Sequence, residues 1–259
     1  MRVALIGGGR MGRELTRALA ESDDELSHVV SRSHAGTDMG VLSGVGEMGV
    51  LLQTGFDGIE DADVVIDFSL PAASVSLFEY AKAHKLRVVS GTTGLDDDGV
   101  RALEELAVAA PVVWAPNFSQ GVALLAHLAV LAAKASPDFD IEIVEMHHRQ
   151  KRDSPSGTAR FLAERVSAAR EPSPPKWVHG REGDVGARPS NELGVLSLRG
   201  GSVVGDHTIV FAGLGERLEL THRADQRSVF AHGALRAARW LCTQTPGRYS
   251  MDDVMGLGS

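Results

Sequence analysis

Residues 2–12 read RVALIGGGRMG, and this stretch decides the fold of the first half of the chain. Residues 2–6 predict a short buried strand, because apolar side chains follow one another without a break. The spacing Gly7-x-Gly9-x-x-Gly12 follows, and apolar residues at helical spacing come after it. Glycines let a backbone turn tightly against a pyrophosphate, and the start of a helix attracts that anion. The stretch predicts a dinucleotide-binding strand, loop and helix, with a plain tight turn as the alternative.

Strand and helix patterns alternate over the next hundred residues. The segment 63–68 is apolar on both faces, which is typical of a strand in a parallel sheet covered on both sides. Further strands are predicted at 26–30, 87–90 and 111–115, with helices at 71–84 and 96–109. This alternation indicates an α/β fold with a doubly wound parallel sheet.

The pattern changes after residue 118. It predicts a helix at 119–135, a strand at 141–146, a helix at 157–169, a loop at 171–194, two strand segments at 195–204 and 207–222 with a turn at 213–215, and a helix at 228–242. The two late strand segments fit an antiparallel sheet. We expect two domains: 1–118 with 228–259 as the dinucleotide-binding domain, and 119–227 as the second domain.

The composition excludes several classes of protein. The 259 residues include 26 Lys and Arg against 34 Asp and Glu, and the net charge of −8 argues against a general nucleic-acid binder. A single cysteine, Cys242, excludes an internal disulfide and a Cys-rich zinc site. The apolar run at 3–6 is too short for a secretory signal, and the one at 122–133 is too short to span a bilayer. We therefore expect a cytoplasmic protein without a membrane partner.

The segment Ser31-Arg32-Ser33 ends the second predicted strand. An acid at this place binds the ribose hydroxyls of NAD, whereas an arginine suits the 2′-phosphate of NADP. Arg32 is thus a candidate cofactor residue, with an exposed surface charge as the alternative.

Two more loops end strands of the same predicted sheet, GTTG at 91–94 and APNFS at 115–119. Ligands of open parallel sheets bind beyond the carboxyl ends of the strands. Hydroxyls of Thr92 and Thr93, the amide of Asn117 and free backbone groups are candidates to hold a nicotinamide and its ribose. Ordinary turn chemistry is the alternative.

Residues 145–159, EMHHRQKRDSPSGTA, carry the most informative chemistry. Five cationic or titratable basic side chains cluster there in an acidic chain, and a helix-start signature follows. Cations beside the free N–H groups of a helix start suit a small carboxylate substrate. His147 and Lys151 can transfer protons. A solvated basic loop is the alternative.

Metal and serine-hydrolase chemistry have little support. His147 and His148 are adjacent and point to opposite faces of a strand, so they rarely bind one ion together. The chain has no HExxH motif, and its serines lack the Gly-x-Ser-x-Gly elbow. We expect no metal.

The motifs together resemble those of the 4-hydroxy-tetrahydrodipicolinate reductases (dihydrodipicolinate reductases) of lysine biosynthesis. The resemblance is nearly end to end. The most specific matching segment is 145–159. The other matching segments are 9–12, Asp67-Phe68-Ser69, 91–94, 117–119, 199–201, 205–207, 222–224 and 246–249. The first loop is one residue shorter than in many members, and Ser31 replaces an acid that many members have.

The resemblance implies a Rossmann-type domain and an α+β substrate domain with a mixed sheet that assembles a homotetramer. It implies reduction of 4-hydroxy-tetrahydrodipicolinate by NADPH or NADH in the diaminopimelate and lysine pathway. His147 matches the proton donor/acceptor and Lys151 the proton donor, while His148, Gly157 and Thr158 match substrate positions. Cofactor positions are Gly7, Gly8, Gly9, Arg10, Met11, Gly12, Gly91, Thr92, Thr93, Ala115, Pro116, Asn117 and Phe118.

Two alternative functions stay open at this point. One is another NAD(P)-dependent oxidoreductase of an amino-acid precursor, with an altered substrate pocket. The other is a catalytically silent dinucleotide-sensing module, which would have no need of the proton donors His147 and Lys151.

Overall fold

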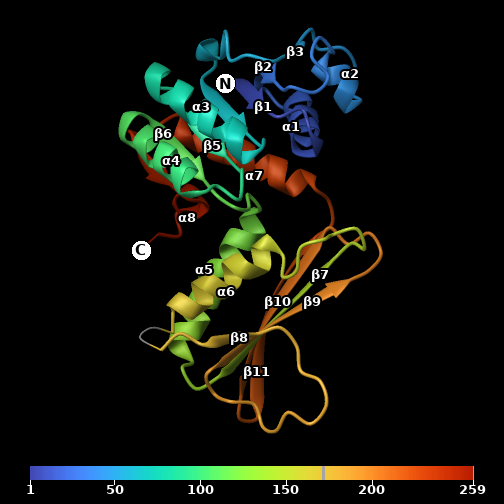
Figure 1. Ribbon diagram of the computed structural model, residues 1–259, viewed down its shortest axis with the longest axis vertical. Helices are drawn as coiled ribbons and strands as arrows, with labels where there is room; N and C mark the ends of the chain where they lie inside the picture. The colour runs from blue at the N-terminus through green and yellow to red at the C-terminus, as the bar shows by residue number, and fades with distance from the viewer. Residues whose placement is uncertain (171–172, 259) are drawn as a thin grey trace. The chain divides into compact units, whose positions relative to one another are not determined.

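The computed structural model describes residues 1–170 and 173–258. The chain forms two compact units (Figure 1). Unit 1 comprises Met1–Gln120 and the segment from Arg227 onward, and unit 2 comprises Gly121–Gln226. The predicted domain boundaries at 118 and 228 lie beside these limits.

Unit 1 contains a seven-stranded sheet in the order β12-β6-β5-β4-β1-β2-β3. Its strands are β1 (Arg2–Ile6), β2 (Glu25–Val30), β3 (Leu52–Gln53), β4 (Val64–Asp67), β5 (Val88–Ser90), β6 (Pro111–Trp114) and β12 (Gly247–Tyr249). All pairings are parallel. The chain proceeds outward from β1 in both directions, so the order reverses between β1 and β4, where ligands of doubly wound sheets bind. The predicted doubly wound parallel sheet is confirmed.

The helices of unit 1 cover both faces of this sheet. They are α1 (Arg10–Ala20), α2 (Met39–Ser43), α3 (Pro71–His84), α4 (Asp97–Ala109), α7 (Ser228–Leu241), α8 (Met251–Met255) and a 3-10 turn at Ile59–Asp61. Helices α3 and α4 pack together, and α7 packs on α1 and on strands β4 to β6. Figure 1 shows α3 and α4 in front of the strands and α7 behind them. Helix α7, which follows unit 2 in the chain, is thus part of unit 1.

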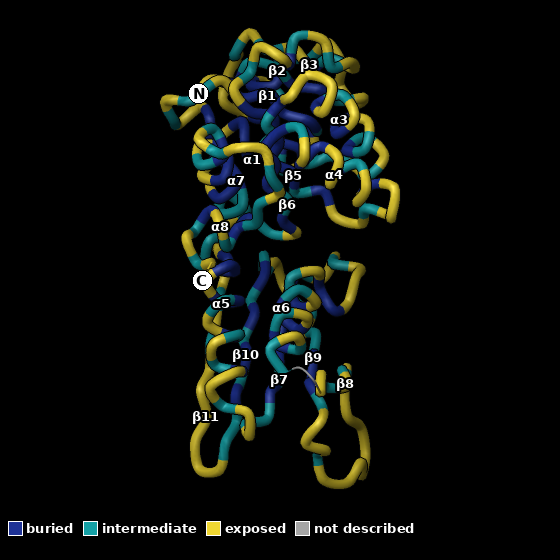
Figure 2. The backbone as a smooth tube through the Cα atoms, turned by 90° about the vertical axis from the view of Figure 1, so that its left-hand side faces the viewer, coloured by how far each residue is buried: buried dark blue, intermediate teal, exposed yellow. Residues whose placement is uncertain are grey.

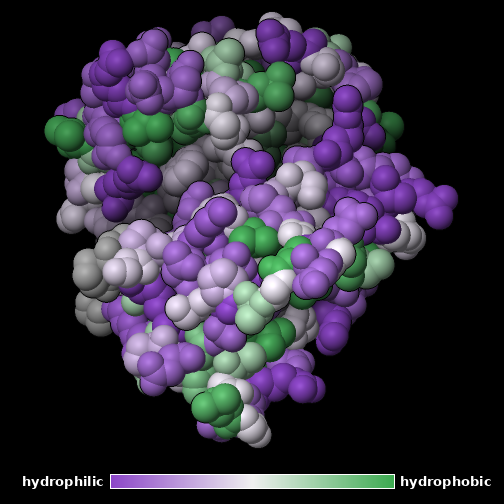
Figure 3. Space-filling model, turned by 60° about the horizontal axis from the view of Figure 1, so that its bottom comes forward, coloured by the Kyte–Doolittle hydropathy of each residue, from purple (hydrophilic) through white to green (hydrophobic). Residues whose placement is uncertain are grey.

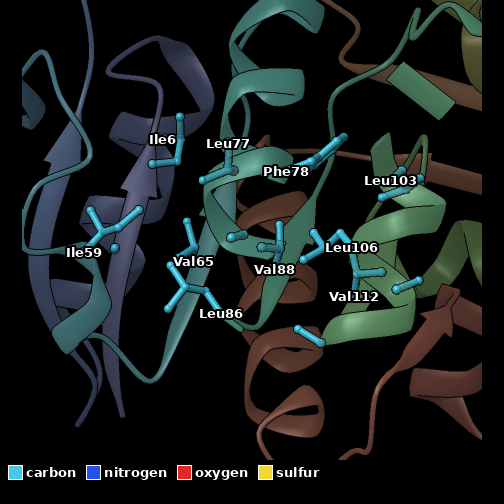
Figure 4. Packing of buried hydrophobic residues seen from close by; sticks show 14 of the residues in the cluster. Ile6, Ile59, Val65, Leu77, Phe78, Leu86, Val88, Leu103, Leu106 and Val112 are labelled. Atoms are coloured by element: carbon cyan, nitrogen blue, oxygen red, sulfur yellow. The ribbon is translucent and has the colours of Figure 1, made fainter. Parts of the chain in front are cut away.

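One core cluster lies between the sheet and helices α3 and α4 (Figure 4). Val65 and Val88 point from the strands toward Leu77, Phe78 and Leu106, and all are buried. Full burial of such a side chain contributes about 1.5–3 kcal/mol. All four residues of β4 are buried, because helices cover the sheet on both sides. This explains the unbroken apolar run in the sequence.

Unit 2 contains a five-stranded sheet in the order β11-β10-β7-β9-β8. Its strands are β7 (Asp140–His147), β8 (Lys176–Val178), β9 (Glu192–Arg199), β10 (Gly205–Gly213) and β11 (Glu216–Ala224). β10 is antiparallel to β7 and β11, whereas β9 is parallel to β7 and β8. The antiparallel interpretation is therefore wrong for β9, which covers the first half of the predicted segment 195–204, and the mixed sheet is confirmed. Whether β9 lies parallel or antiparallel to β7 depends on the path of the 44-residue connection between them (148–191). No local sequence pattern predicts that path.

Buried and half-buried residues alternate along β7, because successive side chains point to opposite faces of the sheet. The tip of the β10–β11 hairpin, in contrast, is exposed (Figure 2). Ile141 and Ile143 face the helices α5 (Gln120–Ala135) and α6 (Gly157–Ala168) and lie in a second buried core cluster. The opposite face, which we call the outer face, carries Val144, Met146, Leu196, Leu198 and Val210 from three strands. These side chains are half-buried, and Leu198 is 50% exposed.

The hairpin between β10 and β11 has its turn at Leu214 and Gly215, as the turn predicted at 213–215 implies. Gly215 has a φ of +82°, a conformation that favours glycine. The predicted strands at 195–204 and 207–222 are displaced relative to β9, β10 and β11. The predicted loop at 171–194 contains β8 and the start of β9, and its residues 171–172 lie outside the described part of the chain.

The elements that the sequence analysis missed are short. They are α2, β3, the 3-10 turn, β8, β12 and α8, which have two to five residues each. A periodic pattern needs more residues than these to show itself. Where the chain is described, no helix combines the length and the apolar character that crossing a membrane requires. On the face shown in Figure 3, hydrophilic residues predominate and hydrophobic ones form small separate groups.

Candidate active site

The loop between β1 and α1 requires glycine at several positions. Gly7 has a φ of +108°, and a β-carbon there would lie 2.6 Å from the carbonyl oxygen of Phe68. At Gly12, in the first turn of α1, a β-carbon would lie 2.0 Å from the carbonyl oxygen of Gly7. Helix and loop therefore approach each other more closely than any side chain permits. The sequence signature is realised as a tight strand-to-helix turn.

The start of α1 is open toward a ligand. Gly9 caps the helix without a side-chain hydrogen bond, and a β-carbon on it would have no heavy atom within 4 Å. Arg10 is exposed and Met11 is half-buried. The space beside Gly9 is thus open, and the free backbone N–H groups at the start of a helix are suited to binding a pyrophosphate.

A cavity of about 670 Å³ lies against this loop. Its lining combines the glycines with residues that follow other strands: Ile6, Gly7, Gly8, Gly9, Val30, Ser31, Arg32, Ser33, Thr54, Phe56, Phe68, Ser69, Leu70, Ala72, Ala73 and Ser76. Its size is that of a small-molecule site. The cavity lies at the carboxyl ends of β1, β2 and β4 and includes the reversal of strand order. The residues present fit a dinucleotide.

Ser31 and Arg32 reach this cavity as the sequence predicts. The Ser31 hydroxyl accepts a hydrogen bond from the N–H of Ser33 at 3.3 Å, and Arg32 is exposed. Sequence reasoning missed Thr54 and Phe56, which also line the cavity. They follow β3, a strand of two residues that gives no readable signal.

The loop after β5 is fixed by a buried carboxylate at the end of β4. Asp67 accepts hydrogen bonds from the hydroxyls of Ser69 (2.5 Å), Ser74 (2.6 Å), Ser90 (2.8 Å) and Thr92 (3.0 Å). The Thr92 side chain, a candidate for holding the cofactor, is therefore engaged inside the protein, and Thr92 is 3% exposed. Any contribution of Thr92 to a ligand comes from its backbone.

In this loop, Gly91 is packed against an aromatic ring, whereas Thr93 is exposed. A β-carbon at Gly91 would lie 2.3 Å from the ring of Phe68, so the loop lies directly on that ring. Thr93 is exposed, and its hydroxyl remains a candidate for ligand contact.

The loop after β6 presents mainly backbone. Ala115 and Phe118 are buried, and Phe118 contacts Phe68 edge-on with the ring centroids 5.5 Å apart. The side-chain oxygen of Asn117 accepts the N–H of Ser119 at 2.7 Å, and Pro116 is exposed. Only Pro116 and Asn117 offer side chains at the surface of this loop.

In unit 2 the basic motif is organised around Glu145, a buried residue of β7. Its carboxylate accepts two hydrogen bonds from Arg199, at 2.8 and 2.9 Å, and one from the N–H of Ser156 at 3.1 Å. It also lies 2.7 Å from Nδ1 of His147. Burial alone raises the pKa of Glu145, but the hydrogen bonds from His147 and Arg199 outweigh it and bring the pKa well below its ordinary value. Glu145 is a carboxylate at neutral pH.

His147 ends β7 beside a second imidazole. His147 is 8% exposed, and its ring meets that of His207 with the centroids 5.2 Å apart at 76°. Burial, together with the neighbouring His147, lowers the pKa of His207 to about 3, so His207 is neutral. The sequence analysis did not connect His207 with the motif, because the two residues meet only through the register of β7 and β10.

Lys151 and the start of α6 complete this group. The ammonium of Lys151 lies 3.0 Å from the carboxylate of Asp153. Ser156 caps α6 by accepting the N–H of Ala159 at 3.1 Å. Gly157, the first residue of the helix, is exposed, and Thr158 and His148 are half-buried. The imidazole of His147, the ammonium of Lys151 and the start of α6 thus lie on consecutive segments, and Glu145 contacts both His147 and the N–H of Ser156.

Metal binding finds no support in this arrangement. Among residues 1–170 and 173–258, no three His, Cys, Asp or Glu side chains are grouped so that they could hold an ion. Unit 1 thus offers a cavity that fits a dinucleotide, and unit 2 offers a cluster of basic and titratable side chains.

Family models match both parts of the chain. Residues 1–118 match the model for the N-terminus of dihydrodipicolinate reductase, and residues 121–255 match that for its C-terminus. A 4-hydroxy-tetrahydrodipicolinate reductase of Alkalilimnicola ehrlichii is 44% identical over 99% of this chain and 99% of its own length. One of Rhodopseudomonas palustris is 45% identical over 100% of this chain and 98% of its own length.

Solved structures agree with the sequence comparison. The dipicolinate-bound dihydrodipicolinate reductase of Paenisporosarcina sp. TG-14 has a TM-score of 0.77 at 27% identity and covers 96% of this chain and 97% of its own. An amine dehydrogenase of Mycobacterium smegmatis, at 12% identity and a TM-score of 0.62, is similar in fold alone; it covers 97% of this chain and 95% of its own. The chain belongs to the dihydrodipicolinate reductase family.

Proposed function

We propose that this chain reduces 4-hydroxy-tetrahydrodipicolinate to tetrahydrodipicolinate in the diaminopimelate and lysine pathway, with NADPH or NADH. The chain is an oxidoreductase of its family, alike in sequence to 4-hydroxy-tetrahydrodipicolinate reductases over its full length. The observation that carries the proposal is the cluster of His147, Lys151 and the α6 start around the buried Glu145. A silent sensing module would not need this cluster.

The cofactor is assigned to unit 1. The glycine loop and the start of α1 would hold the pyrophosphate, and Arg32 would contact the adenosine ribose or its 2′-phosphate. Neither Ser31 nor Ser33 repels a phosphate, so NADPH is expected to bind at least as well as NADH. When bound, the cofactor supplies hydride. Backbone groups at 91–93 and 115–118 are assigned to the nicotinamide side.

The substrate is assigned to unit 2. A cyclic dicarboxylate has two anionic groups, which suit the ammonium of Lys151, the imidazole of His148 and the backbone N–H groups of Gly157 and Thr158. In support, the related structure from Paenisporosarcina carries dipicolinate, a planar cyclic dicarboxylate. Holding both carboxylates fixes the ring, and such fixation is a large part of catalysis.

The residues of this site then control a proton. The hydroxyl leaves the ring as water, which gives a conjugated imine. Reduction of this imine at the ring carbon that lost the hydroxyl leaves an electron pair on the conjugated atoms of the ring, and a proton must be delivered there. Lys151 is assigned as the proton donor, and His147 as the donor/acceptor. Both are assigned without a metal.

The proposal includes a homotetramer that assembles through unit 2. The outer face of its sheet carries Val144, Met146, Leu196, Leu198 and Val210, apolar side chains that are half-buried or exposed in a single chain. Such a face, left open, favours association. Nucleic acid is not proposed as a partner. A cytoplasmic location is proposed because the single cysteine forms no internal disulfide.

A coupled assay tests the function. The substrate is generated in situ from pyruvate and aspartate semialdehyde by a synthase, and the absorbance of NADPH and of NADH is followed in separate reactions. Oxidation that requires both this protein and the synthase product is expected. If neither cofactor is oxidised, the proposed reaction is wrong; if the chain then still binds NADPH, the sensing-module alternative gains support.

A further inference from the structure

The carboxylate of Glu145 links three parts of the unit 2 site. Its Oε2 atom contacts Nδ1 of His147 and accepts a hydrogen bond from Nη1 of Arg199. Its Oε1 atom accepts hydrogen bonds from Nη2 of Arg199 and from the backbone N–H of Ser156. Every one of these groups can donate, and a carboxylate only accepts. The position of His147 and the start of α6 are therefore fixed by one buried group.

This arrangement decides which nitrogen of His147 carries hydrogen. Because Glu145 is ionised, Nδ1 of His147 must present its hydrogen to it. In the neutral ring Nε2 then has the lone pair, and protonation adds the second hydrogen at Nε2. Proton exchange at His147 thus runs through Nε2 alone.

The surroundings of Nε2 are set by a glycine on the neighbouring strand. Gly205 lies opposite His147 where β10 begins, next to the pair Asp206 and Met146. A β-carbon on Gly205 would lie 2.9 Å from Nε2 of His147. That is closer than a β-carbon can approach a ring nitrogen, so any side chain at 205 would press on Nε2 and displace the ring of His147.

We propose that Glu145 and Arg199 are positioning residues for His147, and that Gly205 keeps its Nε2 free for proton exchange. The proposal rests on the proton-transfer role assigned to His147 above. Arg199 acts by donating hydrogen bonds to both oxygens of the Glu145 carboxylate, and a planar guanidinium is best suited to this bidentate contact. It also donates to the carbonyl oxygen of Asp153 at 2.7 Å, which ties the Lys151 loop to the same group.

The other titratable groups around His147 do not compete for this role. His207, against the ring, is neutral because burial lowers its pKa to about 3. Burial also lowers the pKa of His222, opposite His207 on β11. Lys151 is within electrostatic reach of His207 and is held by Asp153. Glu145 is left as the anion in contact with His147.

The tautomer of His147 is the most direct test. In protein labelled with ¹⁵N-histidine, the His147 signals are identified by their loss in H147Q. We expect the Nδ1–H form in the wild type at a pH where the ring is neutral. E145Q places an amide against His147 and Arg199, and we expect it to lose this preference. G205A keeps Glu145 and should retain the Nδ1–H form.

Kinetics give the second readout. Both E145Q and G205A should lower kcat by at least about 10-fold, and up to about 100-fold, because a small misplacement of a reacting group has such effects. The KM for the dinucleotide should change less than twofold, since its cavity belongs to unit 1. E142Q is the matched control: Glu142 is also on β7 and also paired with two arginines, but on the outer face. G213A, at the other end of β10, is the steric control.

The outcomes separate this proposal from the proposed function. An E145Q protein that keeps the Nδ1–H form and wild-type kcat overturns the positioning role of Glu145, while H147Q still tests His147 independently. Full turnover in H147Q would overturn the role of His147 and this proposal with it. If E145Q does not fold, R199K takes its place: we expect a partial loss of kcat, and wild-type kcat would contradict the proposal.

Discussion

The hydroxyl of Ser90, at the end of β5, donates a hydrogen bond of 2.8 Å to the buried carboxylate of Asp67, at the end of β4. This bond connects neighbouring strands where their loops begin. Hydroxyls from α3 and from the loop after β5 converge on the same carboxylate. A buried charge must be compensated, and here hydroxyl groups take part in compensating it. The loop 91–93, assigned to the cofactor, is thereby anchored from within.

S90A should reduce stability by about 1.5–3 kcal/mol, because a hydrogen bond to a charged group is lost and the carboxylate stays buried. The measurement is the free energy of unfolding in urea. S76A is the control, since the Ser76 hydroxyl is exposed and bonds only to its own helix; it should change stability by less than about 0.5 kcal/mol. Equal effects of the two variants would refute the anchoring role of Asp67.

K151A should lower turnover by about 100- to 10,000-fold, the usual contribution of a positioned general acid. Dinucleotide affinity should stay nearly unchanged, because every lining residue of the cavity belongs to unit 1. Steady-state kinetics and fluorescence titration with NADPH measure the two effects. R152A removes an exposed cation from the same loop and serves as control. Weak NADPH binding with intact turnover in K151A would instead place Lys151 at the cofactor.

R32A should weaken NADPH binding by about 10- to 100-fold, as expected when charge-assisted bonds of about 1.5–3 kcal/mol are lost. NADH has no 2′-phosphate, so its affinity should hardly change. Calorimetric titration of both cofactors measures this, and R101A, on the exposed surface of α4, is the control. A wild-type preference for NADH of tenfold or more would show that Arg32 does not read the ribose.

L198E should convert the proposed tetramer into smaller species, because it places a charge on the outer face of the unit 2 sheet. Light scattering coupled to size-exclusion chromatography gives the mass. L214E is the matched control, because Leu214 is fully exposed at the tip of the β10–β11 hairpin. A wild-type chain that is monomeric at working concentration would contradict the proposed assembly.

His207 makes stability depend on pH in a predictable direction. The unfolded chain binds a proton at this residue below about pH 6.5, but the folded chain does so only near pH 3, because burial lowers the pKa of His207 to about 3. Stability is therefore fully present above pH 6.5 and falls by up to about 1.4 kcal/mol per pH unit below it.

H207Q should lack this contribution. Its loss of unfolding free energy between pH 6.5 and pH 5 should be smaller than that of the wild type by about 1.5–2 kcal/mol. Urea unfolding at several pH values measures the difference. H232Q, which removes an exposed histidine, should follow the wild-type curve. Parallel curves for H207Q and the wild type would contradict the burial of a neutral His207.

The parts of the fold that sequence reasoning predicted well are those with local causes. The strand β1, the glycine loop and α1 follow from apolar runs, helical spacing and the conformational freedom of Gly7. Helices α3 and α5 follow in the same way from periodicity over many residues. Short elements such as β3 and β12 escaped, because two or three residues form a strand only when a neighbouring strand supplies hydrogen bonds.

In the candidate site, too, sequence reasoning predicted the local features and missed those that depend on contacts between distant segments. The residue types of the basic motif, His147 and Lys151 beside a helix start, can be recognised in the sequence because they are close together in it. Their partners are not: Arg199 is 54 residues from Glu145, and His207 meets His147 only through strand register. The same holds for Thr92, a candidate ligand contact whose hydroxyl is engaged by Asp67, 25 residues away.

The amino-acid sequence by itself determined the parallel sheet, the dinucleotide loop, the family and the chemistry of the basic motif, because these depend on short segments and on residue types. Only the tertiary structure decided that Glu145 is buried against Arg199, that Nδ1 of His147 faces it, and that β9 pairs parallel to β7. Such features arise from contacts between distant segments, whose free energy depends on burial and register and leaves no mark in local sequence.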